Sequence, residues 1–317
     1  MSATSINTNQ HYVPQMLLRG FEIEPGSEQV WAFDKRTDKA FITTVRNIAA
    51  ERGYYDLGEN ATIDDVMTRA DDMTFPIIDS IRQRRSVSRL SGQDRGLLAG
   101  FVVLQFLRTR GMQEKMRNLE ETVAARVHEM TGQFPEKWEE EGQPEKQREH
   151  YLQTIREFTQ DFLPHLLNKN LILYETDRNA PFCCSDDPVA MTNTINPGDG
   201  LRGTIGLAVP GIEIHLPISS ELSLAYTCPT IGAAFEAMQQ NYRSHGGLFL
   251  EEAFCYLRAR DFGLSMKLQP ENVRFHNSLQ IINAERFVIA SRNDFADAAD
   301  IVVGDPKVRT GRRFGMN

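Results

Sequence analysis

The chain has 317 residues, a formal net charge of −8 at pH 7 and 41% hydrophobic residues. This length and composition are those of a folded globular protein with one large domain or two ordinary ones. An acidic chain gains no general attraction to a phosphate backbone, so contact with nucleic acid would require a local basic patch. Four cysteines, none of them in a Cys-x-x-Cys pair, argue against a disulfide framework and suit a reducing compartment.

The sequence predicts neither a signal peptide nor a transmembrane segment. The first ten residues, MSATSINTNQ, are polar and uncharged, and the longest strongly apolar run, residues 96–104, is too short to span a bilayer. We therefore expect a soluble, cytoplasmic protein with no membrane partner.

The N-terminal part is predicted to contain a short helix and a β-hairpin. In VPQMLLRGF (13–21) the helix begins at Pro14, whose missing N–H has no partner in a first turn, and Gly20 ends it. Apolar residues flank the polar turn Lys35–Lys39 within residues 28–45, which predicts the hairpin.

Three long helical segments are expected between residues 60 and 168. The first covers residues 62–85, with Thr62 as N-cap and a kink or split at Pro76. The second runs from Ser91 to about Met130, and its first half should be buried because it is apolar on every side. A polar loop at 132–147 overlaps the start of the third, which begins near residue 144.

Beyond residue 168 the pattern changes to short apolar strands between 170 and 227, separated by Gly, Pro, Asn and Asp. Helices are expected at 230–244, at 249–261 and from Asn277 to about Ser291. This order predicts an α+β fold: a mainly helical body with a small antiparallel sheet built from the N-terminal hairpin and the strands in 170–227. We expect one domain over 1–317 (helix-rich 60–168, strand-rich 169–228, C-terminal helices 229–295), because no clean linker separates the parts.

The opening stretch NQHYVPQMLLRGF (9–21) offers the first candidate site. Gln15 and Arg19 lie four residues apart and share a helix face, and His11 precedes that helix. Together they would present an imidazole, an amide and a fixed cation. The structural alternative is that His11 caps a turn while Gln15 and Arg19 face water.

A second candidate is the pair Gln105 and Arg108, inside the most apolar helix of the chain. A buried guanidinium is costly unless it is paired, so we predict that Arg108 meets a carboxylate or a backbone partner. The pair then either lines a cavity for an anionic ligand or forms a structural salt bridge.

The turn CCSDDPV (183–189) is the third candidate. Ser185, Asp186 and Asp187 follow a strand and precede a proline, where a carboxylate often holds a metal or acts as a base. A side chain that bonds its own turn is the alternative. Familiar phosphate-binding, zinc and nucleophile motifs are missing from the sequence. Basic runs at 82–89 and 307–314 either contact phosphates or are solvated helix ends and tails.

Seven segments of the chain resemble, in their order, the bacterial domain-of-unknown-function family 4238. They are the opening motif, VWAFDK, AERGYYD, LQFLRTR, CCSDDPV, IHLPIS and FHNSLQIINAERFVIAS. That family opens with Asn-x-His-Tyr-x-Pro-Gln-x-x-Leu-Arg-x-Phe and carries a Ser-Asp-Asn-Pro turn, where this chain has Asp187 in place of Asn. The resemblance implies no activity. It singles out a set of positions as site candidates: His11, Pro14, Gln15, Arg19, Phe21, Gln105, Arg108, Ser185, Asp186, Pro188, Pro217 and Asn277.

Two functions are open from the sequence. The first is a metal-assisted hydrolase of phosphoesters or nucleic acid, in which His11, Gln15, Arg19 and Asp186 converge on one catalytic pocket. Asp186 and Asp187 would then hold Mg²⁺ or Mn²⁺, and Gln105, Arg108, Ser185 and Asn277 would contact a phosphate-containing ligand. The second is a non-catalytic ligand-binding or interaction protein whose polar cluster is structural.

Overall fold

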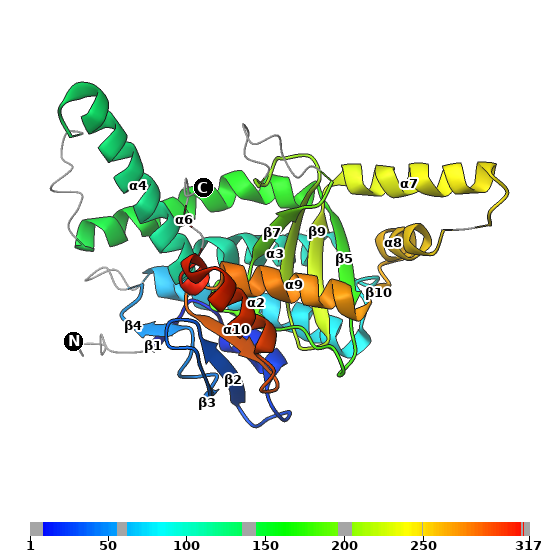
Figure 1. Ribbon diagram of the computed structural model, residues 1–317, viewed down its shortest axis with the longest axis horizontal. Helices are drawn as coiled ribbons and strands as arrows, with labels where there is room; N and C mark the ends of the chain where they lie inside the picture. Colours follow the sequence, from blue (N-terminus) through cyan, green and yellow to red (C-terminus); the bar gives the residue numbers. More distant parts are fainter. Residues whose placement is uncertain are drawn as a thin grey trace.

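The computed structural model describes residues 9–55, 62–134, 144–195, 205–248, 250–311 and 313. It confirms the predicted α+β fold, in which helices surround sheets of mainly antiparallel strands (Figure 1). In the described part of the chain, no helix is long and apolar enough to cross a membrane.

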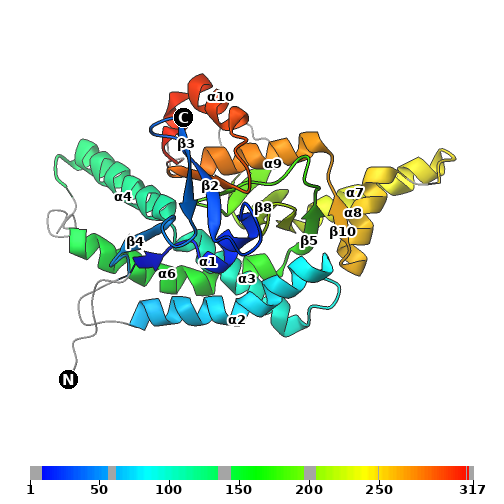
Figure 2. The ribbon, with the colours of Figure 1, turned by 90° about the horizontal axis from the view of Figure 1, so that it is seen from below.

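The largest sheet has five strands in the order β10-β5-β9-β8-β7. Neighbours are antiparallel except for β10 and β5, which run parallel. The sheet lies between α9 (Pro270–Asn283) on one face and a layer of three helices on the other (Figure 2). These helices are α2 (Thr62–Arg84), α3 (Gly92–Leu107) and α6 (Pro144–Leu167). The strands of the sheet are β5 (Asn170–Glu175), β7 (Ala190–Asn193), β8 (Ile212–Pro217), β9 (Leu222–Thr227) and β10 (Ser265–Lys267).

The predicted hairpin, β2 (Gln29–Asp34) and β3 (Lys39–Thr44), belongs to a separate sheet in the order β3-β2-β11-β6. β6 (Cys184–Ser185) comes from the 170–227 region, and β11 (Phe287–Ala290) comes from the C-terminal part. The sequence pattern predicted one sheet, whereas the structure divides the strands because β11 pairs with both β2 and β6. A two-stranded ribbon joins β1 (Asn9–His11) to β4 (Ala50–Arg52).

The helix predicted from Ser91 to Met130 is two helices, α3 (Gly92–Leu107) and α4 (Arg110–Thr131). The break occurs because Thr109 has extended backbone and its hydroxyl caps α4 by accepting the Met112 N–H. α3 begins with a capping box between Ser91 and Asp94. α2 (Thr62–Arg84) continues through Pro76, so the expected split does not occur, and α6 spans Pro144–Leu167.

The helix predicted from Asn277 to Ser291 is also wrong in its second half. α9 (Pro270–Asn283) ends early, because the backbone turns extended at Ala284 and the apolar residues 287–290 become β11. A short apolar run of this kind does not distinguish helix from strand by period. The remaining described helices are α7 (Pro229–Ser244), α8 (Glu251–Phe262), α10 (Ala296–Gly304) and the 3₁₀ turn η2 (Pro306–Arg309).

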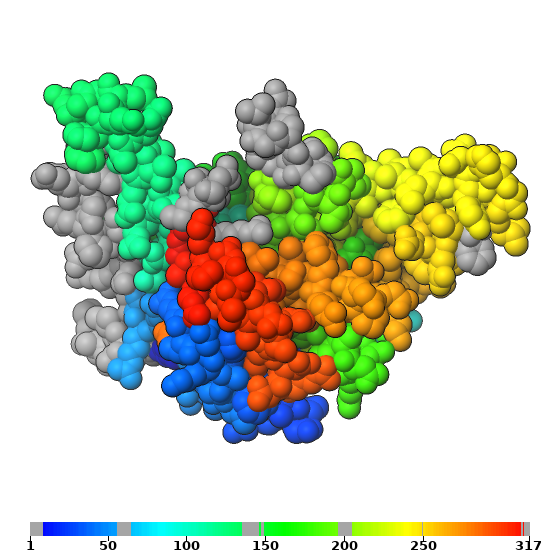
Figure 3. All heavy atoms as spheres, viewed as in Figure 1, coloured from blue at the N-terminus to red at the C-terminus, as the bar shows by residue number. Residues whose placement is uncertain are grey.

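Side chains from both ends of the chain form the cores. One large cluster joins α1, α2, α3 and the five-stranded sheet, and a smaller one joins β2, β11, α9 and α10. The far end of α4 and the α7–α8 pair stand out from this body on opposite sides (Figure 3).

Candidate functional site

The opening motif lines a cleft of about 550 Å³, here called the motif cleft. After β1 the chain turns through α1 (Gln15–Leu18) into the 3₁₀ turn η1 (Arg19–Phe21), and α2 forms the opposite wall. Apolar members of the motif, such as Leu17 and Phe21, are buried in the core. The cleft is lined by Asn9, Gln10, His11, Pro14, Gln15, Met16, Arg19, Tyr55, Met67, Thr68, Asp71, Asp72 and Phe75.

His11 is held in one orientation at this cleft. Its Nε2 lies 3.2 Å from the carbonyl oxygen of Val45, and a carbonyl only accepts, so Nε2 carries the hydrogen. Nδ1 is then the nitrogen that can take up a proton. Burial lowers the pKa of His11 below its usual value, against the opposing effects of the Val45 and Arg46 carbonyls and of Asp71. The imidazole is therefore mainly neutral at pH 7.

Gln15 and Arg19 share a face, as their spacing predicted. The Arg19 guanidinium donates to Gln15 Oε1 at 3.1 Å and to Glu28 Oε1 at 3.2 Å. This pair holds the arginine beside the cleft and orients the amide of Gln15. The carboxylate partner of Arg19 is therefore Glu28.

A carboxylate that sequence reasoning missed, Asp71 on α2, faces His11 across the cleft. It accepts two hydrogen bonds from Arg108, at 2.7 and 3.2 Å, and the Arg108 side chain is fully buried. Arg108 Nε also donates to Gln105, which donates in turn to the carbonyl of Tyr12 in the opening motif. The prediction that Arg108 is buried with an acidic partner is therefore confirmed.

Gln105 and Arg108 thus do not touch the space of the cleft themselves. They lie behind it, where they fix the Asp71 carboxylate and the backbone of the opening motif. These contacts fit the structural alternative, in which Arg108 forms a buried salt bridge. The salt bridge also fixes the position of the Asp71 carboxylate in the cleft.

Asp186 lies away from the motif cleft, so the prediction that His11, Gln15, Arg19 and Asp186 converge on one pocket is wrong. Its carboxylate accepts the backbone N–H groups of Glu285, Arg286 and Phe287 at 2.8–3.0 Å. Burial raises the pKa of Asp186, and the N–H donors and the nearby Lys35 oppose that rise. The acidic turn lies at the start of β11 because the Asp186 carboxylate accepts hydrogen bonds from these three N–H groups.

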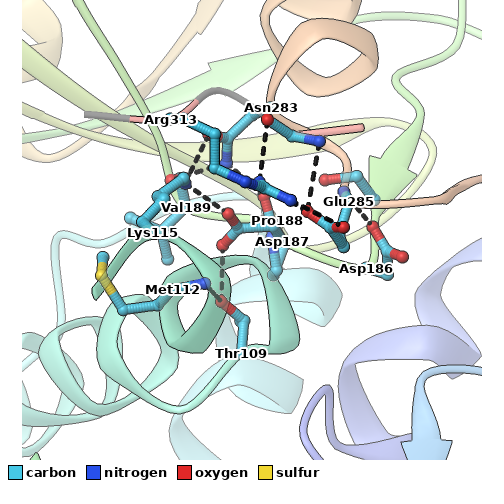
Figure 4. A network of polar contacts seen from close by, with 12 residues as sticks. Thr109, Met112, Lys115, Asp186, Asp187, Pro188, Val189, Asn283, Glu285 and Arg313 are labelled. Carbon is cyan, nitrogen blue, oxygen red and sulfur yellow. Dashed lines mark hydrogen bonds and ion pairs between the residues drawn. The ribbon is translucent and has the colours of Figure 1, made fainter. Parts of the chain in front are cut away.

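Asp187 belongs to a buried network (Figure 4). It accepts the Thr109 hydroxyl at 2.8 Å and the Lys115 ammonium at 2.6 Å, and neither carboxylate oxygen reaches solvent. A side chain at Gly111 would meet this carboxylate, since an added Cβ would lie 2.5 Å from Asp187 Oδ2. Asp187 thus forms a buried ion pair with Lys115.

These contacts bear on the predicted Mg²⁺ or Mn²⁺ site. The carboxylate oxygens of Asp186 and Asp187 already accept hydrogen bonds from N–H, hydroxyl and ammonium donors. Within the described ranges, no group of three or more His, Cys, Asp or Glu side chains is placed to hold a metal ion. The donors, rather than a bound ion, explain why these two carboxylates are buried.

Ser185 and Asn277 have structural partners as well. Ser185 donates to Gln280 Oε1 at 2.9 Å, and Gln280 donates to the Pro188 carbonyl. Asn277 accepts from the Cys183 N–H and donates to the Pro181 carbonyl. With Asn283, which donates to the carbonyls of Asp187 and Val189, amides on one face of α9 bind the strand that leads into and out of the acidic turn.

The basic run at 82–89 is engaged within the fold. Arg82 donates to the carbonyls of Met16, Leu17 and Ile218, and Arg85 pairs with Glu175 and Glu221. These two arginines connect α2 to the ends of β5, β8 and β9.

The structure therefore defines an α+β protein whose opening motif forms one wall of a polar cleft with an anchored carboxylate opposite. A family model described as "Protein of unknown function (DUF4238)" matches residues 9–294, and the chain belongs to that family. No curated protein and no solved structure matches the chain.

Proposed function

We propose that the chain is a hydrolase that uses the motif cleft, with His11 as the general base. The observation that supports this most strongly is an imidazole, fixed through Nε2, in the same cleft as a carboxylate fixed by a buried arginine. General bases of this kind work best when their pKa is near the working pH.

In the proposed reaction, His11 Nδ1 removes a proton from a water molecule as the water oxygen attacks the substrate. The bond to the leaving oxygen breaks, and that oxygen receives the proton from His11 or from solvent. Arg19 and the Gln15 amide donate hydrogen bonds to the negative charge that develops on the substrate. Asp71 stabilises the protonated imidazole, since its negative charge raises the pKa of His11.

The charges of the cleft narrow the substrate class. Asp71 and Asp72 line the cleft with Arg19, and Arg108 behind it offsets Asp71, so the cleft has no surplus of positive charge for a doubly charged phosphomonoester. A phosphodiester carries a single negative charge. We therefore propose a phosphodiester as the substrate, which keeps the phosphoester class expected from the sequence and replaces Asp186 by Asp71.

The test is hydrolysis of bis(p-nitrophenyl) phosphate by the full chain, followed by the absorbance of the released nitrophenolate. His11→Ala and His11→Gln should each lower kcat/KM by about 10²-fold or more. His11→Gln retains a donor for Val45 and should melt as the parent does. His245→Ala, at an exposed histidine after α7, is the matched control and should keep full activity.

Assays in EDTA and in Mg²⁺ or Mn²⁺ separate the metal-free route from the metal-assisted one. The expected pH profile rises with pH and has its midpoint below pH 6.5, because the pKa of His11 is lowered. Saturable binding of the diester without turnover in any of these buffers would replace this proposal by the non-catalytic, ligand-binding alternative.

A further inference from the structure

A second cleft, of about 540 Å³, has Tyr12, Glu51 of β4 and Asp186 among its lining residues. Its most distinctive feature is a group of arginines from four separate parts of the chain: Arg36, Arg110, Arg117, Arg286 and Arg313. We call it the arginine cleft, and we propose that it binds a small phosphate-bearing ligand.

Carboxylates hold these arginines from behind. Glu285, with a nearly buried side chain, pairs with Arg313 at 2.8 Å (Figure 4). It also pairs with Arg36 at 3.1 Å. Arg286 pairs with the buried Asp34 at 2.8 Å, and its guanidinium lies 4.7 Å from the centre of the Phe287 ring. The guanidinium groups are thus oriented before any ligand arrives, which lowers the entropic cost of binding.

The arginines keep donors that the carboxylates do not use. The Nε of Arg286 is buried and has no hydrogen-bond partner among the described residues. The side chains of Arg36, Arg110 and Arg286 remain 39–47% exposed although each is paired. A guanidinium offers five N–H donors, so one anchored edge leaves another to bind phosphate oxygens.

The charge balance favours an anion. Five arginines and four carboxylates, Glu51, Glu114, Asp186 and Glu285, line the cleft, and Asp34 pairs with Arg286 from behind it. Asp186 is further offset by three backbone N–H donors and by the charge of Lys35. In a chain of net charge −8, this concentration of cations is a local exception.

The volume of the cleft fits a compact ligand. A volume near 540 Å³ lies within the range of pockets for small molecules and cofactors. The ligand is therefore a pyrophosphate or a nucleotide of similar size. This site does not depend on the activity proposed for the motif cleft, because the two clefts share no lining residue.

Isothermal titration calorimetry of the full chain with inorganic pyrophosphate and with ADP tests this proposal. The parent should bind saturably, one ligand per chain, in low salt. Arg36→Gln and Arg110→Gln should each weaken the Kd at least tenfold. Both side chains are about half exposed, and Glu285 keeps Arg313, so the fold should persist in circular dichroism.

Two controls separate the site from general attraction and from the hydrolase. Arg126→Gln removes the same charge from the exposed part of α4 and should leave the Kd unchanged. His11→Ala should also bind as the parent does, whatever its effect on turnover. Tighter binding of ADP than of pyrophosphate would identify a nucleotide, and the reverse would identify the phosphates alone.

Three results would overturn the proposal. The first is the absence of saturable binding with both probes. The second is equal weakening by Arg126→Gln and Arg110→Gln, which would indicate non-specific attraction. The third is binding of a single-stranded oligonucleotide without binding of either small probe, which would indicate a nucleic-acid surface instead.

Discussion

Replacing Arg108 by methionine tests whether the buried pair behind the motif cleft stabilises the protein as its geometry indicates. Methionine retains much of the side-chain volume, so the change mainly removes charge and hydrogen bonds. The loss of one partner from a buried ion pair typically costs about 3–5 kcal/mol. Because the Asp71 side chain is 21% exposed, water can reach its carboxylate, and we expect the lower end, about 3 kcal/mol.

Removing the acidic partner instead should destabilise the protein more. Asp71→Asn leaves the Arg108 guanidinium, which is fully buried, without its counter-charge, and the expected cost is about 4–5 kcal/mol. Arg126→Met is the matched control on α4, where an exposed pair with Glu129 should contribute less than about 0.5 kcal/mol.

The free energy of unfolding in urea measures all three variants. The reasoning would be refuted if Arg108→Met lost less than about 1 kcal/mol, or if it lost more than Asp71→Asn, since burial would then not decide the cost. A double-mutant cycle with both substitutions gives the coupling between the two side chains directly.

Three further predictions follow from other parts of the structure. Lys115→Met and Asp187→Asn should each destabilise more than the double variant, measured in urea, because each single change leaves one buried group unpaired. Burial lowers the pKa of His276 to about 4, so the unfolded chain binds the extra proton and stability falls as pH drops from 7 to 5. His276→Phe should remove about 2 kcal/mol of that fall, and an unchanged pH slope would contradict the burial argument. A fragment of residues 1–168 should be insoluble or unfolded, because β2 loses β11; a soluble fragment with a cooperative melt would instead show an independent domain.

Local patterns in the sequence predicted local features well. The hairpin at 28–45 formed around its polar turn, and the i, i+4 spacing of Gln15 and Arg19 placed them on one face beside His11. Arg108 was predicted to be buried and paired because an arginine inside an apolar helix has few alternatives.

Features that depend on distant residues were not predictable in this way. Asp71 has the sequence context of a surface acid on an amphipathic helix, and only its partner Arg108, just after α3 and 37 residues away, gives it a role. Asp186 was assigned to the wrong cleft because its partners are backbone N–H groups about 100 residues further along, which no side-chain pattern reveals. Thr109 was overlooked as a cap because the helical pattern continues through it.

The pairing of β2 with β11 has a consequence for synthesis of the protein on the ribosome. About 240 residues separate the end of the hairpin from the strand that covers its inner edge. At roughly 5–20 residues per second, that edge waits about 12–50 seconds for β11 to emerge. During this interval the nascent chain exposes the unpaired edge of β2 together with Val30 and Ala32, which are fully buried in the folded protein. Premature termination before residue 287 therefore yields a product whose unpaired β2 edge is prone to aggregation, and cellular quality control would have to remove it.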